Sequence, residues 1–161
     1  MPVKPRLLLI GFGQLNQRVA QQLASEFTIT AVSKSHKQAN SVTHLSLNLT
    51  RDDFSVLAET DFIVYCLSPS SYDQLSYRQI FVDCLRKILD HYDECPPKRL
   101  FFVSSTSVYG QNNDEEVNED SIAKPSGFNG RILVEAEQCL RQSTIPSTVI
   151  RFSGIYGHSR T

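Results

Sequence analysis

The sequence predicts an α/β protein built on a doubly wound parallel sheet. An uncharged apolar stretch, residues 7–10, is followed at once by the glycine pair Gly11 and Gly13. Apolar side chains then recur at helical spacing from residue 15 to residue 23, so a buried strand leads through a glycine turn into a helix. Strand and helix patterns alternate along the rest of the chain, which favours about six parallel strands in the order 3-2-1-4-5-6.

The other elements are predicted from the same patterns over a single 161-residue domain. Strands are expected at residues 27–32, 41–47, 62–67, 100–103 and 148–152. Helices are expected as a short piece near residues 51–57, a long apolar-striped helix over 72–92 and a helix over 131–140. The stretch 111–125 is a polar loop that carries five of the seventeen acidic residues.

The glycine turn predicts a phosphate-binding site. Gly11 allows a tight turn, Gly13 lets the backbone approach a pyrophosphate, and the following helix offers N–H donors to it. The pattern is G-x-G-x-x-N, because Asn16 stands where a third glycine would give close packing. A plain connector turn is the alternative, and Asn16 could either widen the packing or donate to the cofactor itself. The residues predicted to bind the cofactor here are Gly11, Phe12, Gly13, Gln14, Leu15 and Asn16.

The end of the second predicted strand bears on the choice between the two nicotinamide cofactors. A carboxylate there would bind the ribose of NAD, whereas cations accommodate the 2′-phosphate of NADP. Ser33, Lys34 and Lys37 follow this strand together with His36, and no acid is present. Hydroxyl and ammonium groups make strong hydrogen bonds to phosphate, so NADP is predicted over NAD. A solvated surface turn is the alternative.

Two further segments bring in a resemblance to a known family. Ser104-Ser105-Thr106-Ser107-Val108-Tyr109-Gly110 resembles the S-S-x-x-V-Y-G segment of the extended short-chain dehydrogenase/reductase superfamily, the NDP-sugar epimerases and dehydratases. The stretch from Arg151 to Gly157 is similar to that superfamily's R-x-x-x-x-Y-G segment. The resemblance implies that Asn48 and Leu49 contact the adenine, that Leu67, Ser68 and Pro69 meet the nicotinamide ribose, that Ser104 contacts the cofactor, and that Ser105 binds the reacting oxygen.

The chain departs from this superfamily at its proton-transfer pair. Members carry Tyr-x-x-x-Lys on the helix after the fifth strand, where the lysine lowers the pKa of the phenol. Here Gly127 stands at the tyrosine position and Arg131 at the lysine position. Arg131 could hold ribose hydroxyls or a phosphate, but an arginine cannot act as acid or base at ordinary pH. These departures resemble the atypical branch of the superfamily.

Two functions are therefore expected. The first is the NAD(P)-binding domain of an oxidoreductase or of a nucleotide-sugar epimerase/dehydratase-like protein, acting on an unknown small molecule. The alternative is a dinucleotide-binding sensor or interaction module without turnover. Because members continue into a substrate-binding lobe and this sequence stops at Thr161, we expect either part of a longer protein or a chain without that lobe.

Composition excludes other classes of protein. Sixteen basic and seventeen acidic residues give no bias toward nucleic acid or membranes, and no signal-like segment precedes residue 7, so a soluble cytoplasmic protein is expected. The cysteines and histidines show no metal-ligand spacing, and the acidic run at 114–120 is expected to be solvated. By resemblance, the helices over 72–92 and 131–140 correspond to those of a homodimer interface. The alternative is that their apolar stripes pack on the sheet of their own chain.

Overall fold

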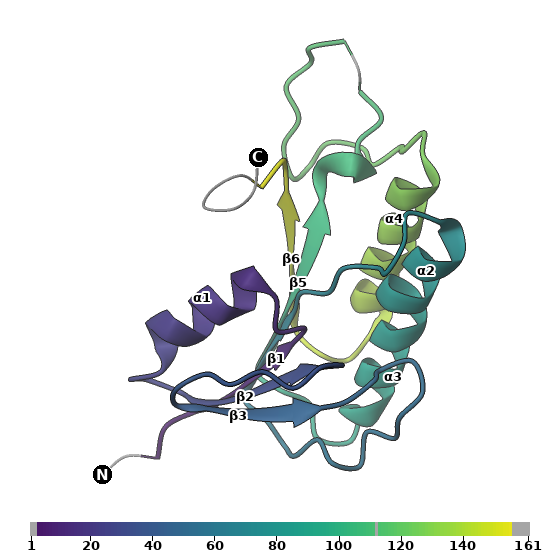
Figure 1. Cartoon of the computed structure of the whole chain (residues 1–161). Helices are drawn as coiled ribbons and strands as arrows, with labels where there is room; N and C mark the ends of the chain where they lie inside the picture. The colour runs from purple at the N-terminus through teal and green to yellow at the C-terminus, as the bar shows by residue number, and fades with distance from the viewer. Residues whose placement is uncertain (1–2, 112, 156–161) are drawn as a thin grey trace.

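A computed structural model describes residues 3–111 and 113–155 (Figure 1). Its strands are β1 (Arg6–Ile10), β2 (Thr28–Ser33), β3 (Val42–Ser46), β4 (Phe62–Tyr65), β5 (Arg99–Ser105) and β6 (Ser147–Phe152). Its helices are α1 (Gln14–Leu23), α2 (Gln74–Arg78), the π-helix η1 (Gln79–Asp83), α3 (Cys84–His91), the 3-10 helix η2 (Thr106–Val108) and α4 (Phe128–Gln142).

The six strands form one parallel sheet in the order β3-β2-β1-β4-β5-β6, which confirms the predicted fold class. Leu8 of the central strand lies opposite Thr30 of β2 and Ile63 of β4. All of residues 7–10 are buried, as expected for a strand covered on both faces. The chain reverses its direction of winding between β1 and β4, and at this switch point the carboxyl ends of the strands leave a crevice.

Helices cover the two faces unequally. In Figure 1, α1 lies on one side of the sheet, and α2, α3 and α4 lie together on the other. The smaller core, under α1, is built around Leu9, Phe12 and Ile29. The larger core, under the three other helices, includes Phe102, Leu85 and Leu133. The edge strand β6 is only half-buried along its whole length.

The predicted helix near residues 51–57 is wrong, because this stretch forms turns. The carboxamide of Asn48 accepts from the Thr50 backbone N–H at 3.2 Å, and the Asp52 carboxylate accepts from the Asn48 N–H at 2.6 Å. Such local side-chain bonds give the backbone an alternative to helix. Phe54 and Leu57 are buried, but they reach the core from turns.

The predicted helix over 72–92 begins later and is interrupted. Asp73 caps it by accepting from the Ser76 N–H at 2.8 Å, and the five-residue π-helix η1 separates α2 from α3. The Tyr65 hydroxyl, at the end of β4, donates to the Ile80 carbonyl inside this wide turn. Wide turns of this kind are frequent at functional sites. Among the described residues, no helix is both long and apolar enough to cross a membrane.

Candidate functional site

The turn after β1 requires glycine at its first position. Gly11 has φ +84°, a left-handed conformation, and a Cβ there would lie 2.2 Å from the Cys66 carbonyl oxygen. Its N–H donates to the Val32 carbonyl at 2.9 Å, which ties the turn to the end of β2. A Cβ at Gly13 would meet nothing within 4 Å, so the protein itself leaves open space beside this residue. No side chain caps the N-terminus of α1, whose donors suit an anion in that space.

Side chains from two elements hold the carbonyl groups of this turn. Asn16 is buried, and its Nδ2 donates to the Gly11 carbonyl at 2.6 Å. The Phe12 carbonyl accepts from Gln17 Nε2 at 3.0 Å and from Lys37 Nζ at 2.8 Å. The carbonyl groups of the turn are therefore held by two side chains of α1, Asn16 and Gln17, and by Lys37 in the segment after β2.

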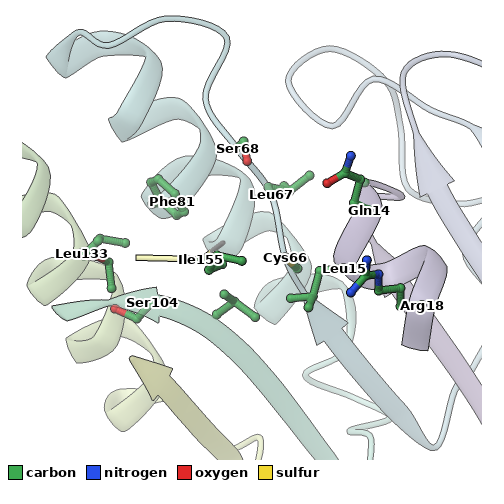
Figure 2. A pocket seen from close by; sticks show the side chains of 13 residues that line it. Gln14, Leu15, Arg18, Cys66, Leu67, Ser68, Phe81, Ser104, Leu133 and Ile155 are labelled. Carbon is green, nitrogen blue, oxygen red and sulfur yellow. The ribbon is translucent and has the colours of Figure 1, made fainter. Parts of the chain in front are cut away.

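Two clefts open at the carboxyl ends of the strands, with volumes of about 620 Å³ and 240 Å³. They adjoin, since Gly13, Cys66, Leu67 and Ser68 line both. The larger cleft extends over the ends of β2 and β3, and the smaller one over the end of β5. Figure 2 shows the smaller cleft, with Gln14, Leu15 and Arg18 of α1 on one side and Leu133 of α4 on the other.

The larger cleft is positively charged. Lys34, Lys37 and Arg51 line it, and no acidic side chain of the described residues does. Ser33 also lines it, and the Ser33 hydroxyl donates to the Ser35 carbonyl at 3.0 Å. This arrangement suits a ligand that carries negative charge near the ends of β2 and β3.

His44 on β3 contacts Ser33 beside the larger cleft, and its surroundings favour the neutral imidazole. Burial lowers the pKa of His44 below its usual value, and the positive charges of His36 and Lys37 lower it further. His44 Nε2 lies 2.8 Å from the Ser33 hydroxyl oxygen, and Nδ1 is buried without a partner among the described residues. The tautomer protonated at Nε2 fits this geometry, because Nε2–H donates to the Ser33 hydroxyl oxygen. Within the described chain, the atom left without a partner is then Nδ1, which carries no proton in this tautomer.

The smaller cleft presents hydroxyl groups on an apolar wall. Ser104 and Ser105 at the end of β5 line it together with Phe81 and Val103. The Ser105 oxygen accepts from the Ser107 N–H at 3.1 Å, so this hydroxyl caps η2 and keeps its own proton available as a donor. Arg18 is the one cation that lines this cleft in the described part of the chain.

A buried ion pair lies directly behind Ser104. Glu137 of α4 is fully buried, and its carboxylate accepts from the Ser104 hydroxyl at 2.8 Å. Arg151 of β6 donates to both oxygens of this carboxylate, at 2.7 and 3.1 Å. Arg151 also donates to the Tyr109 hydroxyl at 2.8 Å, and Tyr109 donates to the Asn118 carbonyl at 2.7 Å. The network ties the ends of β5 and β6 to the acidic loop.

The structure gathers most of the predicted site residues around the two clefts. The exceptions are Asn16, which is buried beneath the turn, Pro69 and Arg131, none of which lines either cleft. Arg131 is exposed and donates to the Ser126 carbonyl at 2.6 Å, while Gly127 only caps α4. The roles of all these residues toward a cofactor stay predictions. Of the Arg151–Gly157 motif, Tyr156 and Gly157 lie outside the described residues.

Sequence reasoning missed Arg18, Arg51 and Gln79, which also line the clefts. Arg18 follows Gln14 by four residues on one face of α1, so helical spacing could have placed it beside the turn. Arg51 directly follows the segment predicted to contact adenine. Gln79 had no signal, because it reaches the cleft from the π-helix. Among the described residues, no group of three His, Cys, Asp or Glu side chains could hold a metal.

Comparison with known proteins rests on structure. No protein-family model matches the sequence, and no curated protein sequence matches it. A protein assigned as an NAD-dependent epimerase/dehydratase from Methylobacillus flagellatus is 32% identical and superposes with a TM-score of 0.80 over 97% of this chain and 56% of that chain. The resemblance to the extended short-chain dehydrogenase/reductase superfamily is confirmed.

Solved structures of lower sequence identity share the fold. UDP-N-acetylglucosamine 4-epimerase from Methanobrevibacter ruminantium is 16% identical, with a TM-score of 0.81 over 93% of this chain and 55% of that one. UDP-glucuronic acid 4-epimerase from Bacillus cereus, solved in complex with NAD, is also 16% identical, with a TM-score of 0.81 over 94% and 57%. The chain thus spans about half the length of the superfamily structures that it matches.

Proposed function

We propose that this chain is a nicotinamide dinucleotide-binding domain that prefers NADP to NAD. The observation that carries the proposal is the pair of adjoining clefts at the switch point, joined through Gly13, Cys66, Leu67 and Ser68. In sheets of this type, ligands bind outside the carboxyl ends of the strands at this point. Related structures, including the Bacillus cereus epimerase, are described with NAD bound.

The residues present fit such a ligand. Gly13 leaves open space at the uncapped N-terminus of α1, which suits a pyrophosphate. The larger cleft would hold the adenosine half, next to Asn48 and Leu49, and the smaller cleft would hold the nicotinamide half, next to Ser104. The carboxamide oxygen of Asn48 already accepts hydrogen bonds from the backbone N–H and the hydroxyl of Thr50.

The preference for NADP is supported by charge. A 2′-phosphate in the larger cleft would face Lys34, Lys37 and Arg51, and no described acid lines that cleft to repel it. One N–H of the Lys37 ammonium is engaged by the Phe12 carbonyl, which leaves two for a phosphate. The test is calorimetric titration of the chain with NADPH and NADH. NADPH is expected to bind at least tenfold more tightly; tighter NADH would refute the preference, and no binding of either would refute the site.

For the chemistry, we propose an oxidoreductase or nucleotide-sugar epimerase/dehydratase-like role for the protein to which this domain belongs. A bound nicotinamide would supply hydride transfer. Ser105 would bind the reacting oxygen, because this residue lines the smaller cleft and the proton of its hydroxyl is available for donation. Arg131 would have to leave the Ser126 carbonyl before it could hold a ribose.

A module without turnover is the second candidate, favoured by the N-terminus of α4. Gly127 offers no side chain there, and Arg131 turns back to the loop before the helix. The variant Ser105→Ala separates the two candidates. If Ser105→Ala keeps NADPH affinity and abolishes a hydride transfer measured with wild type, the module is excluded. If no nucleotide-sugar oxidises or reduces the bound cofactor in wild type, the module is favoured.

We also propose that residues 1–161 form one nucleotide-binding unit of a longer protein, and that it forms a homodimer through the helical segment from α2 to α3 and through α4. Within one chain, Glu135 of α4 pairs with Arg78 of α2 at 2.8 Å and with Arg86 of α3 at 3.3 Å, so these helices already lie side by side in the monomer. Light scattering at micromolar concentration tests the dimer. A mass of about twice 18.2 kDa is expected, and a monomeric mass would contradict the proposal.

A further inference from the structure

Asn16 occupies the position of the third glycine, but it does not merely fill space. Its side chain is buried, with 1% of the residue surface exposed. Nδ2 lies 2.6 Å from the Gly11 carbonyl oxygen and 3.4 Å from that of Ile10. Because carbonyl oxygens only accept hydrogen bonds, the NH₂ group must face them. The Oδ1 atom is buried with no partner among the described residues, so the side chain is oriented by the turn alone.

Among the described residues, the Gly11 carbonyl accepts from one side chain, that of Asn16, whereas the Phe12 carbonyl accepts from two. The Phe12 carbonyl is held twice, by Gln17 Nε2 and by Lys37 Nζ. Within the described part of the chain, Asn16 is the residue that donates a hydrogen bond to the Gly11 carbonyl. Loss of Gln17 therefore leaves the Phe12 carbonyl bonded to Lys37, whereas loss of the Asn16 amide leaves the Gly11 carbonyl without that hydrogen bond.

Gly11 is also the residue on which the direction of the turn depends. Its left-handed conformation reverses the chain between β1 and Gly13, the residue beside the open space at the helix N-terminus. A shift of the Gly11 peptide would be passed on to Gly13 through one intervening residue. A glycine at position 16 could not hold that peptide, because it has no side-chain donor.

We infer that Asn16 is the positioning residue of the pyrophosphate turn: its amide N–H, through the Gly11 carbonyl, holds the turn in the shape that accepts a dinucleotide. This inference rests on the proposed dinucleotide site. Asn16 lines neither cleft, so it acts through the backbone rather than by touching the ligand.

The experiment compares two probes in wild type, Asn16→Ala, Asn16→Asp and the control Gln17→Ala. ADP-ribose carries the pyrophosphate without the nicotinamide, and adenosine 2′-monophosphate reaches only the adenosine half. Asn16→Ala is expected to weaken ADP-ribose at least tenfold and adenosine 2′-monophosphate less than twofold, by calorimetry and competition. Gln17→Ala is expected to change neither by more than twofold. Equal losses for both probes would show a general structural role and overturn the inference.

Asn16→Asp adds a pH-dependent test of the hydrogen bond donated to the Gly11 carbonyl. An ionised carboxylate has no proton to donate to Gly11, whereas a protonated one restores the hydrogen bond. The affinity of this variant for ADP-ribose, divided by that of wild type, is expected to rise at least fivefold from pH 9 to pH 5.5. The division removes the contributions of the basic side chains near the turn, Lys37, His36 and His44, which are present in both proteins. A flat ratio would refute the inference.

The outcomes separate this inference from the function on which it rests. If wild type binds neither probe, the proposed dinucleotide site fails. If wild type binds ADP-ribose and Asn16→Ala binds it as tightly, only the role of Asn16 fails. Thermal unfolding of each variant establishes that it is folded, and Asn16→Asp in its protonated form keeps the shape of the native side chain should Asn16→Ala unfold.

Discussion

At the scale of single residues, two lysines of the larger cleft are proposed to bind the 2′-phosphate of NADPH. Lys34 and Lys37 lie where a 2′-phosphate is proposed, and Lys37 also touches the Phe12 carbonyl. That carbonyl keeps Gln17 as a second donor, so removing Lys37 should not release the turn. The two lysines are therefore expected to serve the phosphate that distinguishes NADPH from NADH.

Lys34→Ala and Lys37→Ala are each expected to weaken NADPH about tenfold, the equivalent of about 1.4 kcal/mol for one charge-assisted hydrogen bond. NADH affinity should change less than twofold in both variants. Lys124→Ala, at an exposed residue that lines neither cleft, is the control and should change neither. Calorimetric titration measures all three. Equal losses for NADPH and NADH would mean that the lysines bind the part that the cofactors share.

Glu137 and Glu135 lie one half-turn apart on α4 and should differ sharply in their effect on stability. Glu137→Gln leaves the guanidinium of Arg151 without its countercharge in a site where the carboxylate is fully buried. Removing one partner of a buried pair costs about 3–5 kcal/mol. Glu135→Gln, at a carboxylate 32% exposed, should cost less than about 1 kcal/mol. Urea denaturation measures both, and a small loss for Glu137→Gln would contradict the argument.

At the scale of elements, the helical segment from Gln74 to His91 is fastened at two places by buried tyrosines. The Tyr65 hydroxyl of β4 donates into its π-helix, and Tyr92, at its C-terminal end, donates to the Ala58 carbonyl at 3.0 Å. Burial raises the pKa of Tyr92 to about 12, with the nearby charge of Arg6 opposing the rise. Burial likewise raises the pKa of Tyr65 well above its usual value.

These shifts predict a loss of stability in alkali. A phenol with a raised pKa keeps its proton in the folded state, so its contribution is complete below the unfolded pKa of about 10 and is lost as pH rises toward 12. For Tyr92 the loss amounts to about 2.7 kcal/mol. Tyr92→Phe should therefore be less stable than wild type by about 1 kcal/mol at pH 8, with the difference shrinking or reversing at pH 11. Urea unfolding at both pH values measures this.

The exposed Tyr72 is the matched control for that experiment. It is 71% exposed, so Tyr72→Phe should follow the wild-type pH dependence. Cys84, whose pKa burial raises to about 11, titrates in all three proteins and cancels from their differences. A difference between wild type and Tyr92→Phe that stays constant from pH 8 to pH 11 would contradict the assignment.

At the scale of the whole molecule, the proposed ligand would bridge both halves of the sheet. The larger cleft lies over β2 and β3, the smaller one over β5, and both share residues that follow β1 and β4. A ligand at a hundred times its dissociation constant raises the free energy of unfolding by about 2.7 kcal/mol. NADPH at that ratio should therefore shift one single unfolding transition, followed by fluorescence and circular dichroism. Two transitions, only one of them shifted, would show that the halves unfold separately.

The sequence by itself determined the strand order, the glycine turn and half of the residues that line the two clefts. Buried strands, helical spacing and the left-handed glycine depend on residues near one another in the chain, and the carboxyl ends of parallel strands must meet at one edge. That Gly127 and Arg131 stand in place of a proton-transfer pair stays a prediction, because it rests on the family resemblance.

Only the tertiary structure decided which partner each polar side chain takes. Lys37 reaches the Phe12 carbonyl and Arg151 reaches Glu137 from distant segments, and the π-helix follows from packing that spacing does not encode. Asn16 remained ambiguous in the sequence because a buried amide takes whichever carbonyl the fold presents. The sequence thus defines the elements through local periodicity, while the chemistry of the site depends on contacts between elements.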